Sequence, residues 1–106
     1  MIYDENSIDL MAERKDGGID LFIISSGEID SSEQTQKLLL NKVEKYLGYI
    51  NSKDFKQDFI DIDTKKIRII FEVEKKAPEL LMKLCEKIVP WAEENGVKFI
   101  VEEKKS

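Results

Sequence analysis

The chain has 106 residues, of which 42% are hydrophobic and 37% charged, and its formal net charge is −5. This length fits a single domain over residues 1–106, and the hydrophobic content excludes a disordered chain. The acidic balance disfavours nucleic-acid binding, which needs clustered lysine and arginine, and no apolar run approaches the ~20 residues that span a bilayer.

Segments 8–14 and 19–25 alternate apolar and polar residues, which is the pattern of half-buried β-strands. Between them, residues 15–18 contain an Asp-Gly and a Gly-Gly dipeptide, both typical of tight hairpin turns. A turn centred on the Asp-Gly dipeptide pairs Met11 with Phe22, and a turn at the Gly-Gly dipeptide keeps the same parity. The sequence therefore predicts a hairpin in which Met11 and Phe22 point to the same face of the sheet.

A long helix is predicted over about 32–51, because capping residues precede apolar residues at helical spacing. The apolar stripe consists of Leu39, Leu40, Val43, Tyr46, Leu47 and Ile50. The following segment, 52–65, is polar but interrupted by Phe55, Phe59, Ile60 and Ile62. We expect an ordered loop that these side chains pin to the core, with room for one helical turn.

A third alternating segment, about 66–74, predicts another strand. A second helix is predicted to begin near Pro78, where the missing N–H of proline costs nothing, and Gly96 is suited to end it. Pro90 lies inside this helix and predicts a kink or a break near Val89, because it removes one backbone hydrogen bond.

The last strand is predicted over about 97–102, and residues 1–6 and 103–106 are expected to fray. The element order is then β-β-α-β-α-β. Strands joined through helices form parallel right-handed crossovers, and each helix has a single apolar stripe. We therefore expect a two-layer α+β fold: a four-stranded mixed sheet with two helices packed on one face, in strand order 1-2-3-4 or 2-1-3-4.

Three features carry a resemblance to a known family: the segment Ser7-Ile8-Asp9, the glycine-marked hairpin, and the helix segment Lys42-Val43-Glu44-Lys45-Tyr46-Leu47-Gly48-Tyr49-Ile50. They resemble a family of small bacterial proteins of unknown function. Its helix between the hairpin and the third strand follows the pattern K-[IV]-x-x-Y-L-x-[FY]-I. The resemblance covers most of the chain and implies no activity.

Histidine is absent, and Cys85 is the only cysteine. Most zinc sites, nucleophilic triads and neutral-pH proton shuttles use histidine, so the composition favours a protein that is not an enzyme and has no cofactor. Cys85 falls on the apolar stripe of the second helix, where a packed thiol is inert. A lone cysteine cannot form an internal disulfide, which fits a reducing, cytoplasmic location.

Three further candidate sites are interpreted as structural. An oxygen-rich loop can bind Mg²⁺ or Ca²⁺, but the spacing of Asp58, Asp61 and Asp63 matches no EF-hand. Residues 25–27 lead to a helix N-terminus, where anions bind, but neighbouring acidic residues would repel phosphate. Trp91 fits core packing at the end of the second helix, with a surface anchor as the alternative.

In each predicted strand, the residues that alternate with the core residues point to the other face of the sheet. Because both helices are expected on one face, this other face is predicted to have no helical cover. Apolar side chains fall at the middle of each strand, and charged ones fall at the strand ends. An apolar stripe with a polar rim is the anatomy of a protein interface. The residues predicted to form this interface are Met11, Phe22, Ile24, Arg68, Ile70, Lys98 and Ile100. If the parallel strands are in register, Asp20, Arg68 and Lys98 share one end of the face, and Glu72 and Glu102 share the other.

The leading hypothesis is a non-enzymatic interaction module that uses this face for homodimerisation or for binding another protein. Neither nucleic acid nor a membrane is expected as a partner. The small size, the acidity and the lack of catalytic residues also suit a toxin-neutralising immunity protein. The alternative is a small-molecule-binding domain or a carboxylate-dependent enzyme with a site near segment 52–65.

Overall fold

The computed structural model describes residue 2, residue 4 and residues 7–104. Within them the chain forms β1 (Leu10–Glu13), β2 (Ile19–Ser25), α1 (Glu33–Ile50), α2 (Lys53–Asp58), β3 (Ile67–Val73), α3 (Glu79–Glu94) and β4 (Lys98–Glu103). The predicted order of the strands and the two long helices is confirmed. The short helix α2 lies in the segment 52–65, predicted as an ordered loop with room for one helical turn.

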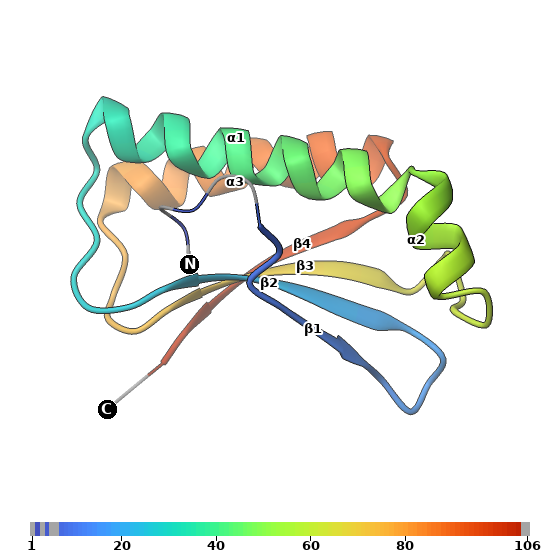
Figure 1. Cartoon of the computed structure of the whole chain (residues 1–106). Coiled ribbons are helices and arrows are strands. Elements are labelled where there is room, and N and C mark those ends of the chain that lie inside the picture. The colour runs from blue at the N-terminus through green and yellow to red at the C-terminus, as the bar shows by residue number, and fades with distance from the viewer. Residues whose placement is uncertain (1, 3, 5–6, 105–106) are drawn as a thin grey trace.

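The strands form one sheet in the order β1-β2-β3-β4. β1 is antiparallel to β2, whereas β2, β3 and β4 run parallel to one another. The helices α1 and α3 lie on the same face of this sheet, and no described helix covers the opposite face (Figure 1). The predicted α+β fold is therefore confirmed, with the first of the two strand orders. Two right-handed crossovers that step in the same direction produce this arrangement.

The hairpin between β1 and β2 closes through an odd number of residues. The N–H of Arg14 donates to the Gly18 carbonyl at 2.8 Å, and the N–H of Gly17 donates to the Arg14 carbonyl at 3.2 Å. Gly17 has a φ of 92°, the left-handed conformation that follows the type I turn in hairpin loops of this kind. The centre of the turn therefore falls on a residue, and not between two residues as the sequence predicted.

This turn shifts the register of β1 by one residue and moves all its side chains to the other face. Leu10 pairs with Phe22, and Met11 pairs with Leu21 on the face that the helices cover. The predicted pairing of Met11 with Phe22 is therefore wrong. The error arose because glycine dipeptides allow hairpin loops of either parity.

The core lies between the helices and the sheet, and both layers contribute fully buried side chains. Each such side chain stabilises the fold by roughly 1.5–3 kcal/mol relative to exposure, so burial holds both helices on this face. The large core side chains that are 0% exposed include Leu21, Ile23, Leu39, Tyr46, Ile69, Phe71 and Leu81.

The helix α2 follows α1 almost directly. The N–H of Phe55 donates to the Ser52 side-chain oxygen at 3.2 Å, which caps the helix. Phe55 is 3% exposed, and its ring meets the Tyr49 ring edge-on at 5.3 Å between centroids. Phe55 thus pins the segment to the core as predicted, whereas Ile60 is 81% exposed and does not.

The helix α3 is continuous through Pro90, so of the predicted kink or break near Val89 the break does not occur. Pro90 faces solvent, and Ile88 and Ala92, two positions before and after it, are buried in the core. Their burial holds both halves of the helix against the sheet despite the lost hydrogen bond. The helix starts after Pro78 and stops before Gly96, which has a φ of 72°, as expected of a helix end.

Four described residues fall in the segments predicted to fray, 1–6 and 103–106, and they are Ile2, Asp4, Glu103 and Lys104. Ile2 is 1% exposed, and its N–H donates to the Ile24 carbonyl at 2.9 Å. Glu103 is the last residue of β4. Residues 1, 3, 5, 6, 105 and 106 lie outside the described residues. No helix in the described part of the chain is long and apolar enough to cross a membrane.

Candidate protein-binding face

The sheet face opposite the helices is here named the open face. Its residues alternate with the core residues along each strand, and they are Leu10, Ala12, Asp20, Phe22, Ile24, Arg68, Ile70, Glu72, Lys98, Ile100 and Glu102. The predicted interface residues meet on this face except for Met11, which packs against the core. Leu10 takes the place that the sequence assigned to Met11.

An apolar row crosses the middle of the open face. Leu10 pairs with Phe22, Phe22 with Ile70, and Ile70 with Ile100. Exposure varies along the row: Leu10 is 51% exposed, but Ile70 is only 4% exposed. Phe22 and Ile100 are half-buried. The accessible apolar surface therefore lies on the two sides of Ile70, which is itself almost fully buried.

A buried carboxylate organises one end of the open face. Asp20 is 6% exposed, and its two oxygens accept hydrogen bonds from Nε and Nη2 of Arg68, both at 2.6 Å. Arg14, from the hairpin, donates to the same carboxylate. Burial opposes ionisation of Asp20, but the hydrogen bonds from Arg68 and Arg14 outweigh it, so the pKa of this carboxyl lies below its usual value. Arg68 is thus held in place, and Lys98 lies beside it on β4.

Gly18 makes room for this arrangement. A Cβ at Gly18 would lie 2.2 Å from Nη2 of Arg14 and 2.4 Å from the Lys66 carbonyl oxygen. Arg14 donates to that same carbonyl at 3.1 Å, which links the hairpin to the start of β3. The second hairpin glycine is therefore required by close packing, since its φ is not among the positive values.

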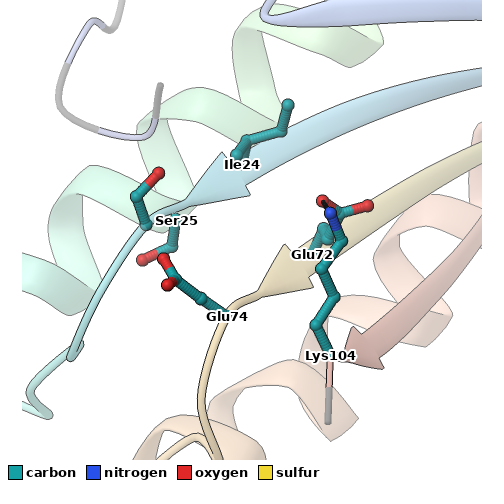
Figure 2. Close-up of a pocket in the computed structure, with 6 residues that line it drawn as sticks. Ile24, Ser25, Glu72, Glu74 and Lys104 are labelled. Atoms are coloured by element: carbon teal, nitrogen blue, oxygen red, sulfur yellow. Dashed lines mark ion pairs between the residues drawn. The ribbon is translucent and has the colours of Figure 1, made fainter. Parts of the chain in front are cut away.

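The opposite end of the open face is acidic and hollowed. A pocket of about 260 Å³ lies where β2 and β3 end, lined by Ile24, Ser25, Ser26, Glu72, Glu74 and Lys104. Figure 2 shows the charged groups of Glu72 and Lys104 meeting at this pocket, with 2.9 Å between Nζ and Oε1. The Glu74 carboxylate accepts a hydrogen bond from the N–H of Gly27 at 2.6 Å. The Glu74 carboxylate thus already accepts the hydrogen bond from a backbone N–H that an anion bound at residues 25–27 would need.

The alternative site near segment 52–65 is an apolar pocket of about 150 Å³, lined mainly by residues of α2 and the loop after it. None of Asp58, Asp61 and Asp63 lines it. Asp63 instead accepts a hydrogen bond from the N–H of Lys65 at 2.9 Å, and its own N–H donates to the Gly17 carbonyl at 2.8 Å. Among residues 2, 4 and 7–104, no group of three or more histidine, cysteine or acidic side chains is placed to hold a metal ion.

Cys85 and Trp91 both belong to the packing of α3. Cys85 is 3% exposed, and burial raises the pKa of its thiol to about 12. Such a thiol stays protonated at neutral pH and is a poor nucleophile. Trp91 is half-buried against the core, and its carbonyl accepts a hydrogen bond from the Asn95 side chain at 3.0 Å.

Sequence reasoning missed a buried ion pair beneath α1. Lys42 is 0% exposed, and its Nζ donates to the Asp9 carboxylate and to the Ser7 carbonyl, each at 2.8 Å. The sequence does hold a signal for this burial. Lys42 lies three residues after Leu39 and four before Tyr46, so it falls on the buried stripe of the helix.

The Tyr46 hydroxyl completes this network at the end of β1. It accepts a hydrogen bond from the N–H of Asp9 at 2.9 Å and donates one to the Phe22 carbonyl. Burial raises the pKa of Tyr46, so the hydroxyl remains a donor at neutral pH. Asp9, Lys42 and Tyr46 come from two of the three segments that carry the family resemblance, and they fasten the N-terminal segment to α1.

Comparison with known proteins identifies the family of this chain. Comparisons with curated proteins and with solved structures find no match. A family model described as a family of unknown function (DUF6572) matches residues 1–105. This range includes the hairpin, the buried ion pair and the whole open face. The chain therefore belongs to this family of unknown function, DUF6572.

Proposed function

We propose that this protein is a non-enzymatic interaction module that binds a protein partner through its open face. One observation carries the proposal: the apolar row from Leu10 to Ile100 crosses a sheet face that no described helix covers. Contact with a partner would remove the exposed parts of Leu10, Phe22 and Ile100 from water, which is favourable. The charged residues at both ends of the row supply the polar rim that protein interfaces have.

The chemistry of the chain supports a binding role over a catalytic one. Histidine is absent, and the single thiol is buried with a raised pKa. Two carboxylates of the open face, Asp20 and Glu72, are engaged by Arg68 and Lys104. A net charge of −5 further favours a protein partner over nucleic acid. A lone cysteine suits the cytoplasm, which we propose as the working compartment.

The ligand-binding alternative has weaker support. The pocket beside α2 has a volume of about 150 Å³, below the roughly 300–1,000 Å³ of typical small-molecule sites. Its lining is mainly apolar, and the aspartates that would supply acid–base chemistry lie outside it.

Photo-crosslinking in cells that produce the protein tests the proposal. A photoreactive residue at Ile100 should yield a crosslinked protein adduct, because this side chain lies in the proposed contact. The same residue at Glu86, which is exposed on α3, serves as the matched control. The additional change Phe22→Lys should suppress the Ile100 adduct, while circular dichroism shows that the fold persists. Adducts that form equally from Glu86, or that survive Phe22→Lys, would contradict the proposal.

A further inference from the structure

The open face carries two pairs of like charges on neighbouring strands. Arg68 lies opposite Lys98, and Glu72 lies opposite Glu102. Like charges directly opposite each other destabilise a sheet. Within the chain, Asp20 offsets the charge of Arg68, and Lys104 offsets that of Glu72.

Lys98 and Glu102 form no such pair among the described residues, and Glu102 is attracted only at longer range by the charges of Lys104 and Arg68. Both are exposed, and no ion pair joins either one to another residue in the described part of the chain. They are four residues apart on β4, with Ile100 midway between them. The face therefore has a positive end and a negative end on either side of the apolar row.

This pattern is self-complementary about one particular two-fold axis. The axis lies between two facing sheets, runs along the apolar row and is perpendicular to the strands. Rotation about it turns the open face of a second copy toward the first and reverses its strand direction. The row then faces itself, and Lys98 of each copy faces Glu102 of the other. A two-fold axis along the strands would instead bring ends of like charge together.

We propose that the partner of the open face is a second copy of this chain, packed face to face with the strands of the two sheets running in opposite directions. The inference rests on the proposed function, since it names the partner for the same face. Such an interface is isologous, because the same patch serves both copies. Two sheets that pack in this way keep their strand directions within about 30° of parallel or antiparallel alignment.

The size of the face sets the expected strength. Four strands spaced ~4.8 Å apart and about six residues long, at ~3.3 Å per residue, give a footprint of roughly 400 Å² per copy. A standard interface buries about 800 Å² per partner, so the dimer belongs to the small, weak class. Its formation should therefore depend strongly on protein concentration.

Charge reversal on β4 tests the inference. In sedimentation velocity, the wild-type protein should show a monomer–dimer equilibrium. The protein concentrations should extend from the micromolar range up to about 1 mM, because a weak dimer dissociates at low concentration. Lys98→Glu and Glu102→Lys should each weaken the dimer at least about tenfold, because two attractive contacts per dimer become repulsive. The double variant Lys98→Glu/Glu102→Lys should restore wild-type affinity, since the charges again face their opposites.

The control is Glu86→Lys on α3, which changes the charge outside the open face and should leave the dimer unchanged. Urea denaturation of each variant confirms that these exposed substitutions leave the fold intact. A wild-type protein that stays monomeric at the highest concentration would overturn the inference, as would a double variant no tighter than the single ones. If Ile100 then still crosslinks to a different protein in cells, the proposed function stands and only the identity of the partner is wrong.

Discussion

Lys42 and Asp9 are charged side chains that folding withdraws almost completely from water, with side-chain exposures of 0% and 1%. Removing two charges from solvent is expensive, and their attraction offsets this only when the remaining donors and acceptors are satisfied. Here they are satisfied: Lys42 also reaches the carbonyls of Asp4 and Ser7, and Asp9 also accepts from the N–H of Ile24 at 2.9 Å. The pair therefore fixes the path of the N-terminal segment against α1.

Lys42→Met tests this role. The substitution fills much the same volume but leaves the Asp9 carboxylate buried without its cation, so we expect a loss of about 3–5 kcal/mol in the free energy of unfolding. The double variant Lys42→Met/Asp9→Asn removes both charges and should recover part of that loss. Urea denaturation at neutral pH measures both. A single variant within about 1 kcal/mol of the wild type would show that the pair does not hold the segment.

Asp20 predicts a dependence of stability on acid pH. Its pKa in the folded chain is lowered relative to the unfolded chain, so its carboxylate stabilises the fold at neutral pH. That contribution is lost as the pH falls through the unfolded value of about 3.9 and then through the lower folded value. Asp20→Asn should therefore be less stable than the wild type by about 1–2 kcal/mol at pH 7.

The difference between the two proteins should shrink as the pH approaches about 2, since protonation then removes the same charge from the wild type. Urea denaturation from pH 7 down to pH 2 would show the two curves converging. A constant gap over this range would mean that the hydrogen bonds of Asp20 with Arg68 and Arg14 do not depend on its charge.

At the scale of elements, the hairpin decides which side chains of β1 face the partner. Its loop depends on Gly17 for a positive φ and on Gly18 for close contact with Arg14 and the Lys66 carbonyl. One residue more or less in this loop would return Met11 to the open face and move Leu10 under the helices.

Two glycine substitutions should change stability in opposite directions. Gly18→Ala forces a Cβ to 2.4 Å from a backbone oxygen, so we expect destabilisation of at least about 2 kcal/mol. Gly48→Ala is the matched control, because Gly48 lies inside α1 with open space around its Cβ position. Alanine there should stabilise the fold by about 0.5–1 kcal/mol. Thermal unfolding followed by circular dichroism gives both signs, and equal effects would contradict the close packing at Gly18.

The alternation of apolar and polar residues predicted the parallel part of the sheet closely. Periodicity assigns Phe22, Ile70 and Ile100 to one face and the crossovers make their strands parallel, but the sequence left two strand orders open, and only the observed order places these residues in one continuous row. The register of β1 could not be predicted in this way, because consecutive residues of β1 are apolar and either set could face the core. The choice depends on whether the hairpin loop has an even or an odd number of residues, which the local backbone conformation decides. The burial of Lys42 depends on Asp9, which is distant in sequence, so spacing alone could suggest it but not identify its partner.

At the scale of the molecule, the two crossovers place all helical mass on one side of the sheet (Figure 1). The open face is left with an apolar row, a positive end at Arg68 and Lys98, and a negative end at Glu72 and Glu102. β3 and β4 each have this polarity along their length, and their register brings the like charges together at each end of the face. The third parallel strand, β2, differs, because its open-face residues are Asp20, Phe22 and Ile24.

Added salt should weaken the proposed dimer where the facing charges are opposite, and strengthen it where they are alike. Raising the salt from about 0.1 M to about 1 M shortens the Debye length from ~10 Å to ~3 Å and screens contacts at the exposed rim. The wild type and the double variant Lys98→Glu/Glu102→Lys should therefore dissociate more readily at high salt. The single variant Lys98→Glu should associate more tightly, because salt screens its repulsive contacts. Sedimentation equilibrium measures all three dissociation constants, and a shift of the same sign in each would mean that Lys98 and Glu102 do not face each other across the interface.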